Sequence, residues 1–87
     1  LPATGPPIAR CRRENGLGWS HLKLGARVRA ERHAEASVAA AGDSGSLRLR
    51  AKALNLLATC RDDPTLRARA RAIARRLEDE ALAMRFR

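Results

Sequence analysis

The hydrophobic pattern is clearest in the second half of the chain. Between residues 47 and 60, apolar side chains recur at spacings of three and four, at Leu47, Ala51, Leu54 and Ala58. This spacing places them on one face of an α-helix. A second stripe continues it, through Leu66, Ala70, Ile73, Leu77, Ala81 and Met84. We therefore predict two amphipathic helices, over residues 47–60 and 64–84.

The break between these helices has the residues of a helix start. Asp63 is a good N-cap, because its side-chain oxygen can accept a hydrogen bond from a free amide of the first turn. Pro64 then takes the first helical position, where its missing N–H costs nothing. Because the connection is short, we expect the two helices to fold back on each other as an antiparallel hairpin.

The first half of the chain has a weaker pattern. Small residues recur at four-residue spacing, at Ala26, Ala30, Ala34 and Val38. They predict a helix over residues 21–41 with a narrow face against which another helix can pack. Ser20 is its predicted N-cap. Residues 42–46, Gly-Asp-Ser-Gly-Ser, predict a linker, with Ser44 or Ser46 capping the helix that follows.

The first 19 residues are predicted to form an extended arm with a short helix and a glycine turn. Three prolines exclude regular structure from residues 1–7. A short helix is expected from Ile8 to Glu14, ended by a turn at residues 15–18, where two glycines lie close together. Residues 20–87 would form the helical domain. The predicted fold class is all-α, a small helical protein with a C-terminal antiparallel hairpin and an extended N-terminal arm.

Composition indicates that the core is small. The chain has 87 residues, enough for one domain, and its apolar residues include 18 Ala and 12 Leu but only one Phe, one Trp and no Tyr. Aromatic side chains usually supply much of the buried area of a small domain, so a chain with only two of them is expected to be marginally stable alone. This favours a protein held within a larger assembly.

The charge indicates what the partner is. The net charge is +9, from 16 Arg and two Lys against nine carboxylates. A guanidinium group binds phosphate oxygens through two parallel hydrogen bonds and stacks on bases, which an ammonium group cannot do. RNA is therefore the first predicted partner, and an acidic protein surface is the second. Codon bias in a GC-rich genome would explain the excess of Arg over Lys, but not the net charge.

Eleven basic residues are predicted to bind nucleic acid. They are Arg10, Arg12, Arg13, Lys23, Arg27, Arg29, Arg67, Arg69, Arg71, Arg75 and Arg76. Arg67, Arg71 and Arg75 form one helical ridge, in which each like-charge pair costs about 0.2–0.5 kcal/mol. The acidic residues 78–80 follow the cations, opposite to what the helix dipole favours. Bound anions would remove this repulsion; the alternative is a solvated face partly neutralised by residues 78–80.

No residue pattern indicates catalysis. His21 and His33 lie far apart in sequence, and Gly16 and Gly18 form a lone G-x-G without the rest of a nucleotide loop. We predict no enzyme, no catalytic residue, no cofactor and no metal site. Cys11 and Cys60 belong to no C-x-x-C pair, which favours two reduced thiols in a reducing, intracellular compartment.

Trp19 and the N-terminal segment have two interpretations each. Trp19 can stack on a base or plug a small core. Residues 1–13 begin with Leu1 and carry Arg10, Arg12 and Arg13 but no acid, like the tail of an organelle transit segment, which makes a mitochondrion or another organelle a candidate location. No apolar run is long enough for a membrane span, so no membrane insertion is expected.

Three functions remain open. The first is a structural RNA-binding component of a ribonucleoprotein, such as an accessory ribosomal protein, which holds phosphates through dispersed arginines. The second is a helical protein-interaction adaptor or subunit of a large complex, which docks through the hairpin. The third is a small helix-turn-helix DNA-binding protein, in which residues 9–32 supply a helix, a glycine turn and a second helix with Lys23, Arg27 and Arg29.

Overall fold

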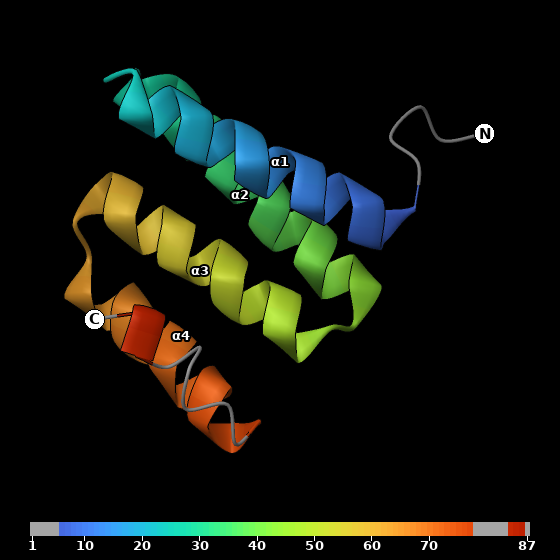
Figure 1. The fold of residues 1–87 in the computed structure, drawn as a ribbon. Helices are drawn as coiled ribbons and strands as arrows, with labels where there is room; N and C mark the ends of the chain where they lie inside the picture. Colours follow the sequence, from blue (N-terminus) through green and yellow to red (C-terminus); the bar gives the residue numbers. More distant parts are fainter. Residues whose placement is uncertain (1–5, 78–83, 87) are drawn as a thin grey trace.

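The structure, a computed structural model, describes residues 6–77 and 84–86 of the chain. Four helices of three turns or more make up the described fold (Figure 1), and no strand occurs within these residues. They are α1 (Pro7–Lys23), α2 (Arg27–Ser44), α3 (Leu47–Arg61) and α4 (Pro64–Arg76). The predicted all-α class is confirmed.

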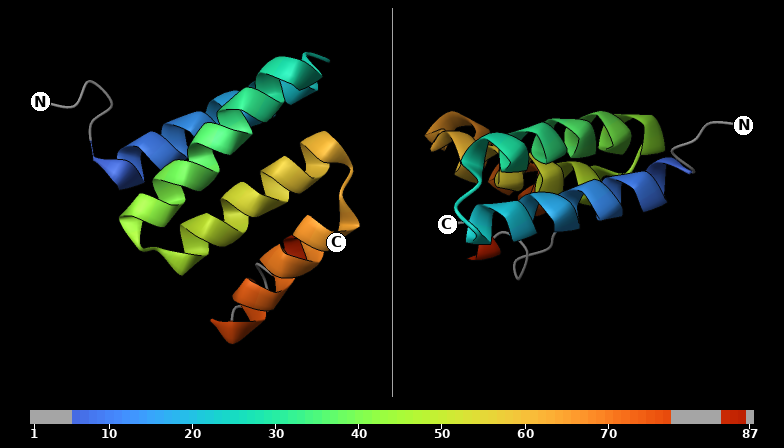
Figure 2. Two further views of the ribbon diagram at one scale, coloured as in Figure 1. Left: turned by 180° about the vertical axis from the view of Figure 1, so that it is seen from behind. Right: turned by 90° about the horizontal axis from the view of Figure 1, so that it is seen from above.

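Helix α3 is the centre of the fold. It packs against α2 and α1 on one side and against α4 on the other, and successive helices run in alternating directions (Figures 1 and 2). More of its residues are buried than in any other described helix, and Leu56 is completely buried. The predicted helix over residues 47–60 ends one residue before α3 does. Helix α3 buries apolar side chains around most of its circumference, and not only along the predicted stripe.

The core consists mostly of alanine. Eight alanines are completely buried, namely Ala30, Ala34, Ala40, Ala51, Ala53, Ala58, Ala70 and Ala74. Small side chains let helix backbones come close together, so a chain that is poor in large apolar residues can still exclude water between its helices. Leu49, Leu54, Leu56, Leu57 and Phe86 supply the larger buried side chains.

Helix α1 corrects the prediction of a glycine turn. Residues 15–18 are helical, and α1 continues unbroken from Pro7 to Lys23. Gly18 is buried, and a Cβ atom at this position would lie 2.5 Å from Cδ2 of Leu56 and 3.4 Å from the carbonyl oxygen of Ala30. This glycine therefore allows α1 to pack closely on α3 and α2, and does not form a turn. Pro7 lies in the first turn of the helix, where its missing N–H is tolerated.

The turn between the first two helices lies at Gly25, inside the segment predicted as one helix over residues 21–41. Gly25 has φ = 79°, in the left-handed region that glycine adopts without strain. Ser20, the predicted N-cap, lies inside α1. Helix α2 then extends to Ser44, so the predicted 42–46 linker shrinks to Gly45, at φ = 72°, and Ser46.

The helix starts of the second half are as predicted. The Ser46 hydroxyl accepts a hydrogen bond from the Leu49 amide at 3.2 Å. Asp63 Oδ1 accepts from the amides of Thr65, at 2.9 Å, and Leu66, at 3.2 Å, while Pro64 occupies the first turn. Both side chains satisfy amides that have no partner within the helix.

Helix α4 ends at Arg76, whereas the apolar stripe predicted a helix to residue 84. Residues 78–83, which include the predicted acidic cluster, lie outside the described residues. Phe86 is only 3% exposed and packs with Ala70 and Ala74. One straight helix would put residue 86 about 24 Å beyond residue 70, at about 1.5 Å per residue, so it cannot place Phe86 there. Because the helix ends here, Arg75 and Arg76 occupy its last turn, where cations favour the helix dipole.

Polar contacts join neighbouring helices. Arg61 at the end of α3 donates from Nε to Glu31 Oε1 of α2 at 2.8 Å and from Nη2 to Glu35 Oε1 at 3.3 Å. A 2.6 Å hydrogen bond joins His33 Nδ1 of α2 to Glu14 Oε2 of α1. These contacts fix α2 against both of its neighbours.

Candidate nucleic-acid interface

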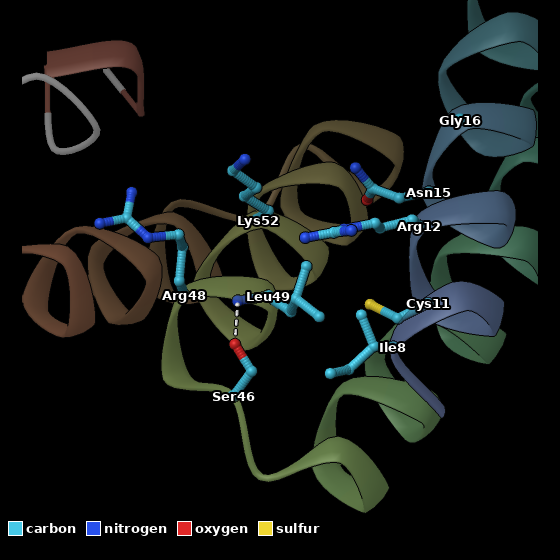
Figure 3. Close-up of a pocket in the computed structure, with 9 residues that line it drawn as sticks. All are labelled: Ile8, Cys11, Arg12, Asn15, Gly16, Ser46, Arg48, Leu49 and Lys52. Atoms are coloured by element: carbon cyan, nitrogen blue, oxygen red, sulfur yellow. Dashed lines mark hydrogen bonds between the residues drawn. The ribbon is translucent and has the colours of Figure 1, made fainter. Parts of the chain in front are cut away.

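Two adjoining pockets lie between α1 and α3 and share Asn15 and Lys52; together we call them the α1–α3 groove. The first pocket has a volume of about 390 Å³ and is lined by Ile8, Cys11, Arg12, Asn15, Gly16, Ser46, Arg48, Leu49 and Lys52 (Figure 3). The second has a volume of about 350 Å³ and is lined by Asn15, Trp19, Lys52, Asn55, Arg85 and Phe86. Both volumes fall within the ~300–1,000 Å³ typical of ligand pockets.

Each wall of the groove is one helical stripe. On α1, Arg12, Asn15 and Trp19 are three and four residues apart, which puts them on one face. On α3, Arg48, Lys52 and Asn55 follow the same rule. The stripes face each other because α1 packs mainly on α2 and approaches α3 over a smaller area, leaving the groove open at its edge.

The charged side chains among the described lining of the groove are all basic. Four cations line its two pockets, Arg12, Arg48, Lys52 and Arg85, and none of the described lining residues is a carboxylate. Figure 3 shows the Arg12 side chain extending from α1 toward α3 above Ile8, Cys11 and Leu49, while Lys52 extends upward from α3 and Arg48 extends to the left, away from α1. Like charges gathered between low-dielectric walls attract an anion more strongly than isolated surface charges do.

Asn15 has an unsatisfied polar atom at the junction of the two pockets. Its Oδ1 atom is buried and accepts no hydrogen bond from any described residue. A buried acceptor without a partner costs about 1–3 kcal/mol, and such an atom in a native fold requires an explanation, for example a bound group. The Asn15 side chain lines both pockets, although its Oδ1 atom is itself closed off from solvent.

Trp19 is part of the core, as one of its two interpretations predicted, and it also lines the groove. It is half-buried and packs against the core cluster that contains Ala30, Ala34 and Leu56, and it also lines the second pocket. Its indole is thus fixed by the core on one side and accessible from the groove on the other. A tryptophan held in this way can contact a planar group without first losing side-chain freedom.

Of the eleven predicted binding residues, only Arg12 lines the α1–α3 groove. Arg10 forms a 2.9 Å ion pair with Asp43, and Arg13 lies 3.9 Å from Glu14. Lys23, Arg27 and Arg29 are exposed around the turn between α1 and α2, outside the groove. The N-terminal cluster of the sequence prediction is therefore spread over several surfaces.

The predicted arginine ridge of α4 is not one exposed face. Arg67 and Arg71 are half-buried, and Arg67 Nη2 donates to Thr59 Oγ1 at 3.4 Å, whereas Arg75 is exposed. Arg69 and Arg76 lie on the other flank, in a pocket of about 360 Å³ between α3 and α4. Its lining is Leu47, Arg50, Leu54, Arg69, Ala72, Ile73 and Arg76, with no carboxylate among them.

Sequence reasoning missed most of the groove. It did not select Asn15, Arg48, Lys52, Asn55 or Arg85 as site residues. The available signal was the helical spacing of polar residues within each segment, 12–15–19 and 48–52–55. No residue close to either stripe in the sequence indicated that the two stripes face each other.

The remaining chemistry of the described residues is limited. His21 and His33 stack with ring centroids 5.1 Å apart. No group of three or more His, Cys, Asp or Glu side chains within residues 6–77 and 84–86 could hold a metal ion.

Both cysteines are buried free thiols, and burial, reinforced by Glu31, raises the pKa of Cys60. No described helix is both long and apolar enough for a bilayer span.

Comparisons with protein-family models, curated proteins and solved structures find no match to this chain. The candidate interface therefore rests on the geometry and charge of the groove.

Proposed function

We propose that the protein is a structural RNA-binding component of a ribonucleoprotein, such as an accessory ribosomal protein, and that the α1–α3 groove is its main RNA contact. The observation that carries this proposal is the lining of the groove: Arg12 of α1, Lys52 of α3 and Arg85 point positive charge at it, with no carboxylate among the described lining residues. Phosphate contacts supply most of the affinity of nucleic-acid binding.

The distribution of charge supports RNA within an assembly. The pocket between α3 and α4, which has Arg50, Arg69 and Arg76 and no carboxylate among its described lining residues, lies on the other side of α3. Cations on several faces suit a small protein wedged among phosphates. The α1–α3 groove also offers Trp19 and two amide side chains, which are groups that contact bases and not only backbone.

The protein-interaction adaptor remains a second candidate for a specific reason. The α3–α4 pocket has Leu47, Leu54 and Ile73 beside its three arginines, a combination that suits an acidic amphipathic helix. The helix-turn-helix candidate has less support, because the turn that it requires at residues 15–18 belongs to α1.

The test is the salt dependence of RNA binding, measured for the intact chain and for two double variants of equal charge. Arg12→Gln with Lys52→Gln alters the α1–α3 groove, while Arg32→Gln with Arg61→Gln removes two exposed charges outside both the groove and the eleven predicted residues. On single-stranded RNA, losing two phosphate contacts should reduce the slope of log K against log salt by about 1.4. The control pair should leave the slope nearly unchanged.

Two results would contradict the proposal. One is equal loss of slope in both double variants, which would mean that only net charge matters. The other is no binding to RNA or duplex DNA at physiological salt, in which case the adaptor function becomes the better account.

A further inference from the structure

We propose that the second pocket of the α1–α3 groove binds one unpaired RNA base against Trp19, with the adjacent phosphate in the first pocket between Arg12 and Lys52. This inference rests on the proposed function and narrows it from RNA in general to a single-stranded segment or an extruded nucleotide. The two pockets share Asn15 and Lys52, so a base and its neighbouring phosphate would be continuous across them.

The second pocket has the composition of a base site. The only tryptophan of the chain and both of its asparagines line it, together with Phe86. Single-stranded RNA is recognised by aromatic side chains that stack on its bases and by polar groups that bind the base edges. The packing of Trp19 against the α2–α3 core fixes the indole before the base arrives.

The unpartnered Oδ1 of Asn15 is the second, independent observation. It is buried and receives no hydrogen bond from the residues that the structure describes. The Watson–Crick edge of every RNA base carries an N–H donor, and also an acceptor for the amide NH₂ group. In a duplex these edges are already paired, so only an unpaired base can satisfy this amide. Because Oδ1 is closed off from solvent, a base meets it only once the Asn15 amide turns into the pocket. The preference for single strands then follows from this contact.

The charges of the groove set the position of the phosphate. Arg12 reaches from α1 toward α3 and Lys52 projects from the opposite wall at the junction of the pockets (Figure 3). A phosphate placed there is in reach of both cations, while Arg85 lies beside the base pocket. The pocket of about 350 Å³ has room for one base but not for a stacked pair of base pairs.

Trp19 fluorescence tests base binding in the second pocket directly, since Trp19 is the only tryptophan that contributes to the emission. The probes are a short uridine oligonucleotide, an abasic oligonucleotide of the same length and a blunt RNA duplex. We expect the uridine oligonucleotide to change Trp19 emission and to bind about 5- to 140-fold more tightly than the abasic one, which corresponds to the ~1–3 kcal/mol of one base–aromatic stack. The duplex should leave Trp19 emission unchanged.

Asn15→Ala separates the base site from a structural role. The substitution removes a buried unsatisfied oxygen and puts a better helix former at this position, so the variant should melt at a higher temperature than the original chain. It should nevertheless lose most of its preference for the uridine over the abasic oligonucleotide. Arg12→Gln is the matched control, which should weaken both oligonucleotides by the same factor.

The outcomes distinguish the two proposals. Equal affinity for the uridine and abasic oligonucleotides, with no change of Trp19 emission, overturns the base site and leaves phosphate binding in place. An Asn15→Ala variant with unaltered base preference also overturns it. Absence of binding by every probe overturns both the base site and the proposed function.

Discussion

Gly18 of α1 lies directly against Leu56 of α3: a Cβ atom on residue 18 would sit 2.5 Å from the Cδ2 atom of Leu56, which is completely buried. Gly16 lies two residues earlier on the same helix, and a Cβ atom built on it would have no other atom within 4 Å. Two glycines of one helix thus have opposite environments, although they are nearly adjacent in sequence.

This difference predicts opposite effects of alanine. Gly16→Ala should raise the free energy of unfolding by about 0.5–1 kcal/mol, because alanine restricts the unfolded chain and favours the helix. Gly18→Ala gains the same propensity but forces Leu56 to move within a packed core, which costs about 1–3 kcal/mol. Urea unfolding followed by circular dichroism should therefore place Gly18→Ala below Gly16→Ala by about 1–3 kcal/mol. Equal stabilities would show that α1 does not pack on α3 in this way.

The N-cap of α4 is expected to be required for its stability. Asp63→Ala removes the acceptor for the amides of Thr65 and Leu66 and should lower the free energy of unfolding by about 1 kcal/mol. Asp63→Asn keeps an acceptor oxygen without the charge and should lose much less. If Asn and Ala are equally destabilising in thermal melts, the effect is one of charge and not of capping.

The contacts of Arg61 should contribute a modest, salt-sensitive stabilisation. Arg61→Gln removes the ion pairs with Glu31 and Glu35, and because these side chains are partly exposed we expect a loss of about 0.5–1 kcal/mol. The hydrogen bond to Glu31 raises the pKa of Arg61, so the guanidinium stays charged throughout the stable pH range. Arg32→Gln, an exposed arginine of α2, is the control.

Salt provides the diagnostic for Arg61. In 1 M salt, where the screening length falls to about 3 Å, the difference between the original chain and Arg61→Gln should shrink. A difference that is independent of salt would indicate that Arg61 stabilises through packing of its aliphatic part, and would contradict an electrostatic role.

Cys60 should make the fold sensitive to alkaline pH. Burial is the main cause that raises the pKa of this thiol in the folded protein, with Glu31 adding to it. The folded state therefore keeps a proton that the unfolded chain releases, so stability is unaffected below the pKa of an unfolded cysteine and falls as the pH rises through the folded pKa. Urea midpoints between about pH 7 and about pH 10 should fall less steeply for Cys60→Ala.

The control for this prediction is the neutral-pH midpoint of Cys60→Ala itself, which reports the packing lost at a buried site. Parallel curves for the variant and the original chain across the pH range would mean that Cys60 does not titrate differently in the two states.

The helix starts that were predicted correctly depend on interactions between residues close together in the sequence. Ser46 and Asp63 cap helices whose first amides lie two or three residues away, so the residues involved are neighbours in the sequence. The glycines were misread for the opposite reason. Gly18 packs against Leu56 and Gly25 forms the turn, and no residue beside either glycine distinguishes a close helix contact from a turn.

The sequence predicted that the candidate site is basic, but not where it lies. The net charge indicated an anionic partner, but the groove joins residues 12–19 to residues 48–55, and pairing them requires the tertiary packing of α1 on α3. Arginine spacing on α4 suggested one ridge, yet the helix buries part of it, because the stripe of Leu66, Ala70 and Ile73 turns Arg67 toward Thr59.

The alanine core has a mechanical consequence for the groove. Alanine has no side-chain rotamers, so the contacts between α1, α2 and α3 at Ala30, Ala34 and Ala53 cannot rearrange by rotating a bond. Helices that contact each other through alanine methyl groups therefore have a fixed separation. This separation sets the distance between the two walls of the α1–α3 groove. The size of each buried alanine therefore sets the width of the α1–α3 groove. A side chain larger by a single methylene at one of these positions would move the helices apart and widen the groove several residues away.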